Sequence, residues 1–211
     1  MYVPEYFKPD DGAVRELLRN HGAVDLVTAT PSGLRATMLP MIYVEGTAGG
    51  PDRLLGHVAR KNDHWRQPVV GDALAIVRGP DAYITPAWYS TKREHGRVVP
   101  TWNYITAHVH GELVVHEDVE WLEANVRQLT AKHEAGREEP WSVDDAPAQY
   151  VAGQLRAIVG LELLIGRIEA KFKLSQNRSA DDVAGVVSGL VEVGRPDISE
   201  SVRAASRQER R

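Results

Sequence analysis

Residues 23–44 read AVDLVTATPSGLRATMLPMIYV, and this stretch decides the fold. Valine, threonine, isoleucine and tyrosine favour strands, and they are frequent in the two segments 23–30 and 34–44. Pro31, Ser32 and Gly33 separate the segments and form a typical turn sequence. The pattern predicts a β-hairpin, so the sheet begins with two antiparallel strands.

The rest of the chain extends this sheet and adds helices around it. Strands are predicted at 53–58, 72–79, 81–85, 101–116 and 158–172, with a break at Gly79-Pro80. Helices are predicted after the capping residues Asp10 and Ser179, and at 119–129 and 147–156. Hairpin order without alternating strand–helix units predicts an α+β, mainly antiparallel barrel with peripheral helices. We expect one domain over residues 1–193 and a polar, flexible tail over 194–211.

Composition limits the function classes. The 211 residues include no cysteine, which excludes disulfides, thiolate nucleophiles and iron–sulfur clusters. A formal charge of -4 argues against direct DNA binding, because basic residues supply most of that affinity. No apolar run approaches the roughly 20 residues of a membrane span, and the first residues do not resemble a signal peptide. We therefore predict a cytoplasmic protein.

The strand predicted at 101–116 presents an unusual set of side chains on one face. Because side chains alternate along a strand, five of them share that face: Trp102, Tyr104, Thr106, His108 and His110. Aromatic and imidazole groups can contact a substrate or exchange protons with it. Tyr104, His108 and His110 are the candidate catalytic residues, and Trp102 is a candidate cofactor contact. The alternative for the aromatic pair is barrel filling or a dimer contact.

Residues 56–66, GHVARKNDHWR, combine two histidines, a tryptophan and three cations. Cations in a turn can hold a phosphate or a haem propionate, so Arg60 and Lys61 do not distinguish between these ligands. His64 has the simpler alternative of a surface histidine on a short helix.

Seven blocks taken together resemble, in order and spacing, the PaiB-like family of FMN-binding negative transcriptional regulators. The blocks are MYVPEYF, GLRATMLP, GHVARKNDHW, GPDAYITPAWY, VVPTWNY, AIVGLEL and KLSQNR. The resemblance runs from residue 1 to about 190. It implies a split β-barrel related to pyridoxamine-phosphate oxidases, and a homodimer with cofactor sites at the subunit interface. It also implies a cofactor phosphate held by side chains that here correspond to Arg35, Thr37, Arg60 and Lys61.

The chain departs from this family at one position. Members commonly read N-P-Q-W or N-D-Q-W in the block that here reads Asn62-Asp63-His64-Trp65. A neutral imidazole binds haem iron well, whereas an amide does not. A branch that resembles this family comprises haem-dependent piperazate synthases, which form an N–N bond within Nδ-hydroxyornithine. By this resemblance His64 is the candidate axial ligand of haem b, with His57 as second choice.

Three functions therefore remain open. The first is a haem-dependent piperazate synthase that cyclises Nδ-hydroxy-L-ornithine with loss of water. The second is an FMN-binding negative regulator, although the sequence contains no helix-turn-helix pattern. The third is a flavin-dependent oxidoreductase. We predict the haem enzyme, with FMN as the alternative cofactor.

Overall fold

The computed structural model describes residues 1–47 and 49–208. The chain forms two compact units, each built from segments that are far apart in the sequence. Unit 1 contains residues 1–14, 78–107 and the described residues from 169 onward, and unit 2 contains residues 15–77 and 108–168. Three long strands contribute to both units, and the prediction of a single domain over 1–193 stays a prediction.

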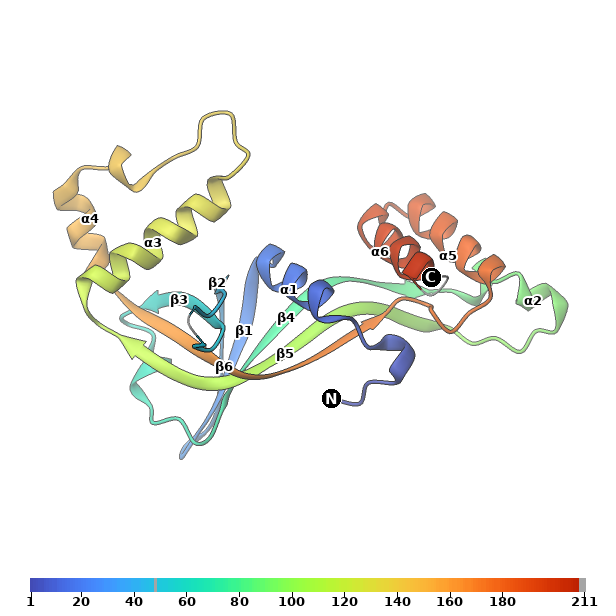
Figure 1. Ribbon diagram of the computed structural model, residues 1–211, viewed down its shortest axis with the longest axis horizontal. Helices are drawn as coiled ribbons and strands as arrows, with labels where there is room; N and C mark the ends of the chain where they lie inside the picture. Colours follow the sequence, from blue (N-terminus) through green and yellow to red (C-terminus); the bar gives the residue numbers. More distant parts are fainter. Residues whose placement is uncertain (48, 209–211) are drawn as a thin grey trace. The chain divides into compact units, whose positions relative to one another are not determined.

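Six strands form a closed antiparallel barrel in the order β1-β2-β3-β6-β5-β4 (Figure 1). They are β1 (Ala23–Thr30), β2 (Gly33–Val44), β3 (Arg53–Ala59), β4 (Ala73–Ile84), β5 (Thr101–His116) and β6 (Ile158–Lys173). The longer helices are α1 (Asp11–Asn20), α3 (Val119–Glu134), α4 (Ala148–Leu155), α5 (Ala180–Glu192) and α6 (Pro196–Gln208). Short helical turns are η1 (Glu5–Phe7), η2 (Asp63–Arg66), η3 (Pro86–Trp88), α2 (Thr91–Glu94) and η4 (Val143–Asp145). The predicted α+β, mainly antiparallel architecture is confirmed.

The hairpin predicted at residues 23–44 is present and sets the register of the barrel. Thr30 pairs with Gly33, and Gly33 takes a φ of 114°, a left-handed conformation that glycine adopts without strain. Val24 and Leu26 on β1 and Leu39 on β2 are buried on one face of this hairpin. The same face carries polar side chains nearer the turn, which become the candidate site below.

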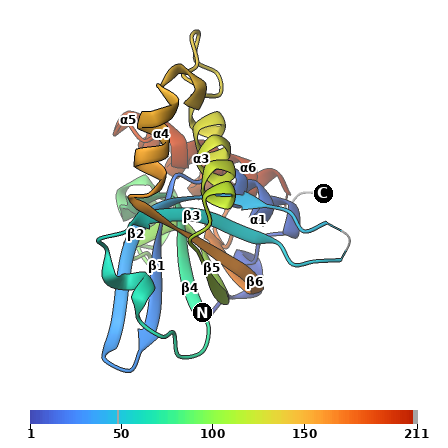
Figure 2. The same cartoon turned by 90° about the vertical axis from the view of Figure 1, so that its left-hand side faces the viewer.

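In unit 2, helix α3 covers an outer face of the sheet. Leu129 of α3 packs on Ile42 of β2 and Leu55 of β3, with Trp121 alongside. Gly160 on β6 makes this possible, because a Cβ at that position would lie 2.2 Å from the Trp121 ring. Helix α4 lies next to α3 in the same unit (Figure 2).

In unit 1, α5 and α6 pack together over a separate apolar cluster. Ser179 caps α5 as predicted, by accepting the backbone N–H of Asp182. The prediction of a flexible tail from residue 194 is wrong for residues 196–208, which form α6; residues 209–211 lie outside the described part. Ile198 and Val202 are fully buried one helical turn apart and anchor this helix.

The predicted break at Gly79-Pro80 is also wrong, because β4 continues through both residues. The pairing of β4 with β1 spans Leu74 to Ile76 and precedes Pro80, whose missing N–H is therefore outside that ladder. Among the described helices, none has the length and apolar character needed to cross a bilayer.

Candidate functional site

His64 lies on the short helix η2, between β3 and β4. Asn62 caps this turn: its side-chain oxygen accepts the backbone N–H of His64 at 3.0 Å. The turn places the imidazole inside the unit, where the residue is only 2% exposed. The alternative of a surface histidine is therefore wrong.

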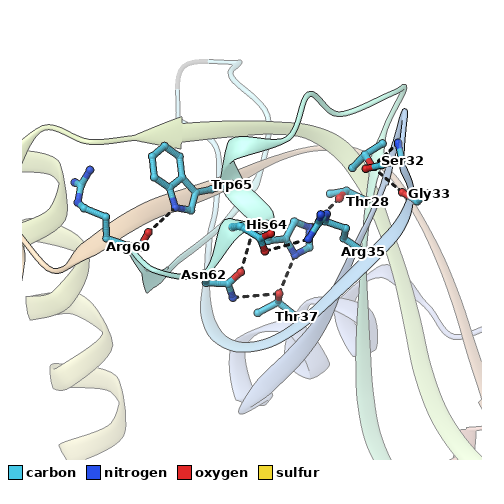
Figure 3. A network of polar contacts seen from close by, with 11 residues as sticks. Thr28, Ser32, Gly33, Arg35, Thr37, Arg60, Asn62, His64 and Trp65 are labelled. Atoms are coloured by element: carbon cyan, nitrogen blue, oxygen red, sulfur yellow. Dashed lines mark hydrogen bonds and ion pairs between the residues drawn. The ribbon is translucent and has the colours of Figure 1, made fainter.

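Two threonine hydroxyls contact the imidazole of His64, one at each ring nitrogen. Thr28 Oγ1 lies 2.8 Å from Nε2, and Thr37 Oγ1 lies 2.8 Å from Nδ1 (Figure 3). A neutral imidazole offers one donor and one acceptor, and a hydroxyl can supply either complement. Burial lowers the pKa of His64, and the nearby charge of Arg35 lowers it further, against a smaller opposing effect of Asp63. The ring is therefore held neutral at pH 7 with both nitrogens engaged.

Arg35 and Asn62 complete this cluster at its exposed side. Arg35 pairs with Thr28 across the hairpin ladder, so both side chains lie on the same face. The Arg35 guanidinium donates to Asp63 Oδ1 at 3.0 Å, and its side chain keeps about a third of its surface exposed, at 32%. Asn62 Nδ2 donates to Thr37 Oγ1 at 3.4 Å.

The structure thus brings three predicted site residues together, namely Arg35, Thr37 and His64. Sequence analysis missed Thr28, although the hairpin register alone would place it opposite Arg35. A cavity of about 310 Å³ adjoins the cluster and is lined by His64, Trp65, Gln67, Val69, Gly71, Glu112, Leu113 and Val115.

This arrangement can be tested against the two candidate cofactors. Haem iron needs a free imidazole nitrogen. Both nitrogens of His64 are hydrogen-bonded to threonine hydroxyls, of the buried Thr28 and the half-buried Thr37. His64 as placed here does not fit an axial ligand. A phosphate needs cationic and hydroxyl donors, and Arg35 with Thr37 supplies both at the accessible side of the cluster. The donor set fits a phosphate.

Arg60 and Lys61, also predicted to bind the cofactor, have different surroundings. The Arg60 guanidinium donates to the backbone oxygens of Arg156 and Ile158 and pairs with Glu117. It therefore ties the end of β3 to the start of β6 and is not free in this structure to hold a ligand. Lys61 is exposed.

His57, the second-choice ligand, lies apart from the His64 cluster. It is on β3, and its Nδ1 is 3.3 Å from the amide nitrogen of Asn125 on α3. Burial lowers its pKa. The burial of His57 is explained by the packing of α3 on the sheet.

The candidate residues on β5 are divided between the two units. Trp102 and Tyr104 belong to unit 1, whereas His108 and His110 belong to unit 2. Within the described residues, Nε2 of His110 is buried without a hydrogen-bond partner. The catalytic roles of these residues stay predictions.

A charged cluster in unit 2 was not predicted. Glu162 is buried on β6, where it accepts from His116 Nε2 at 2.7 Å and from Arg53 at 3.3 Å. The His116 ring stacks on Trp121 with centroids 4.1 Å apart and planes inclined by 9°. These contacts hold the start of α3 on the sheet. They join residues 53, 116 and 162, and no spacing in the sequence indicates that they meet.

Comparison with known proteins identifies related sequences and folds. The sequence profile of the family described as "Putative FMN-binding domain" matches residues 1–167. The protein "Protease synthase and sporulation protein PAI 2" of Bacillus subtilis is 31% identical over 202 residues, which cover 95% of this chain and 94% of that protein.

Two solved structures show the same fold at low identity. The FAD and haem binding protein from Mycobacterium smegmatis aligns with a TM-score of 0.57 at 17% identity, over 85% of this chain and 80% of the other. The flavocytochrome Anf3 from Azotobacter vinelandii aligns with a TM-score of 0.56 at 14% identity, over 87% and 78%. The predicted split-barrel fold is confirmed.

Proposed function

Because this chain belongs to the PaiB-like family of FMN-binding domains, we propose that it is a flavoprotein whose cofactor phosphate is held by Arg35 and Thr37. When bound, FMN supplies a ring that accepts and donates electrons. The protein's contribution is to hold and orient the phosphate end. A fixed guanidinium and a fixed hydroxyl are suited to this role.

The observation that carries the proposal is the hydrogen-bond network around His64 (Figure 3). With its proton on Nδ1, His64 donates to Thr37 Oγ1 and accepts the hydroxyl proton of Thr28 at Nε2. Asn62 also donates to Thr37 Oγ1. The Thr37 oxygen then accepts two hydrogen bonds, and its own proton is left to donate to a ligand beside Arg35.

We expect Arg35→Ala to weaken FMN binding at least about tenfold, because a charge-assisted hydrogen bond contributes about 1.5–3 kcal/mol. Thr37→Val, which keeps the shape but removes the hydroxyl, should weaken it by a smaller factor. Titration followed by flavin fluorescence measures both. Arg19→Ala is the matched control, since Arg19 forms an exposed ion pair with Glu45 elsewhere in unit 2. Equal affinity for FMN in Arg35→Ala and Arg19→Ala would contradict the assigned site.

A haem-dependent piperazate synthase is the second candidate, and the cavity beside His64 favours it, although neither nitrogen of this imidazole is free for iron in this structure. In this function the protein cyclises Nδ-hydroxy-L-ornithine to L-piperazate with loss of water. Iron binding at Nε2 requires the Thr28 hydroxyl to move away. The absorption spectrum of protein expressed with a haem precursor distinguishes the candidates. A Soret band lost in His64→Gln supports the haem enzyme, and a two-banded yellow spectrum supports the flavoprotein.

The Bacillus subtilis relative, whose name refers to protease synthesis and sporulation, supports a regulatory role as a further candidate. Direct DNA binding is disfavoured by the formal charge of -4. A gel shift with promoter DNA at low salt tests whether the protein binds DNA directly. The cytoplasmic location stays a prediction.

We also propose a homodimer. The outward face of β2 exposes Leu34 (79%) and Met38 (74%), and apolar side chains in such a row are typical of a protein interface. A solution mass of one chain would contradict the dimer.

A further inference from the structure

Unit 1 has a pocket of its own on β4 and β5. Its volume is about 290 Å³, and β5 contributes Trp102, Tyr104 and Thr106 to its wall. Ile105 of β5 and Arg78, Gly79 and Asp81 of β4 line the remainder. The residues assigned to the FMN phosphate belong to unit 2, and none of them lines this pocket.

Trp102 is held in place by contacts that leave its ring accessible. Its indole N–H donates to Asp81 Oδ1 at 3.1 Å, and Tyr83 lies beside it with ring centroids 6.2 Å apart. Lys173 Nζ donates to the backbone oxygen of Trp102 at 2.7 Å. The residue is still 49% exposed. Because its single N–H donor is already used, the Trp102 indole can contact a ligand only through the face of its ring.

Cations gather on the same part of unit 1. Lys171 Nζ lies 5.7 Å from the Tyr104 ring centroid, and Lys173 is two residues further along β6. Burial lowers the pKa of Lys173, and the charges of Lys171 and Arg178 lower it further. Neither lysine lines the pocket: Lys171 donates to the backbone oxygen of Tyr2, and Lys173 donates to Thr101 as well as to Trp102. Asp81, the carboxylate of the pocket wall, accepts the Trp102 N–H.

We propose that this pocket binds a mononucleotide, with the base stacked on Trp102 and the phosphate near Arg78. A base has a planar face for the indole, and a phosphate complements the guanidinium of Arg78, which lines the pocket. A pocket of about 290 Å³ is at the lower end of the range for small-molecule sites. The proposal does not depend on FMN binding in unit 2.

Adenosine monophosphate is a suitable probe, titrated by calorimetry without flavin into the Arg35→Ala variant, in which the phosphate site proposed for unit 2 is weakened. We expect saturable binding that Trp102→Ala weakens at least about tenfold, the low end of what base stacking contributes. Trp102→Phe should retain part of the affinity and guards against loss of fold. Trp141→Ala is the matched control, because Trp141 is also 49% exposed but belongs to unit 2.

Adenosine and inorganic phosphate, tested separately, should each bind more weakly than the nucleotide. Absence of saturable binding to the Arg35→Ala protein overturns the proposal. So does an affinity that Trp102→Ala and Trp141→Ala change equally. Because this titration contains no flavin, failure of the FMN site is separate from failure of this one.

Discussion

Replacing Gly111 with alanine is expected to lower the free energy of unfolding by about 3 kcal/mol or more. A Cβ at this position on β5 would lie 1.9 Å from the carbonyl oxygen of Leu164 and 3.2 Å from the amide nitrogen of Gly166, both on β6. The obstructing atoms are backbone atoms of a neighbouring strand, and they cannot move aside as a flexible side chain can. The added methyl group must push β5 and β6 apart and weaken their hydrogen bonds.

Urea denaturation followed by circular dichroism measures this effect. Gly22→Ala is the control, because a Cβ there has no atom within 4 Å and the change should stay within about 0.5 kcal/mol. If both variants unfold at the wild-type urea midpoint, β5 and β6 do not approach each other at Gly111 as described.

The strands were predictable because their sequence signals are local. The hairpin at 23–44 and the strand at 101–116 follow from residue type and alternation, and β5 spans the predicted residues. The break at Gly79-Pro80 was wrong because it depends on which strand lies alongside, and β1 pairs with β4 only up to Ile76. Which strand lies beside Gly79 and Pro80 depends on the tertiary structure and cannot be read from the residues around them.

Helix α6 shows the same limit in a polar segment. Its two buried anchors, Ile198 and Val202, are surrounded in sequence by charged and small residues. Ile198, Val202 and Ala205 follow helical spacing, but only the first two are large apolar residues, so the pattern is weak without knowledge of the cluster that receives it.

The cluster of Arg35, Thr37 and His64 was partly predictable, and the reason also clarifies the family pattern. Position 64 must satisfy two hydroxyls, those of Thr28 and Thr37. A glutamine amide and a neutral imidazole each provide one donor and one acceptor for this purpose. A histidine at position 64, where the family commonly has glutamine, can therefore keep the same role of hydrogen bonding to both threonines. The family resemblance assigned Arg60 to the cofactor, and its contacts with the backbone of Arg156 and Ile158, almost one hundred residues away, could not be read from the sequence.

Acid should destabilise the protein through His21. This residue is 5% exposed, and its Nδ1 contacts the carbonyl oxygen of Leu18 at the end of α1. Burial, followed by the charge of Lys132, lowers its pKa to about 4. The unfolded chain takes up this proton near pH 6.5, whereas the folded chain resists it until about pH 4. Stability is therefore unaffected by His21 above pH 6.5 and falls as the pH drops below it.

We expect the loss due to His21 to reach roughly 3 kcal/mol at pH 4 and to level off below, where both states are protonated. His21→Gln removes the titrating group, so its unfolding free energy should decline less than that of the wild type between pH 6.5 and 4. His57 and His64, whose pKa values are also lowered, contribute in the same direction in both proteins and cancel in the difference. His95→Gln, on an exposed loop, is the matched substitution. Parallel curves for wild type and His21→Gln would show that His21 is not buried in its neutral form.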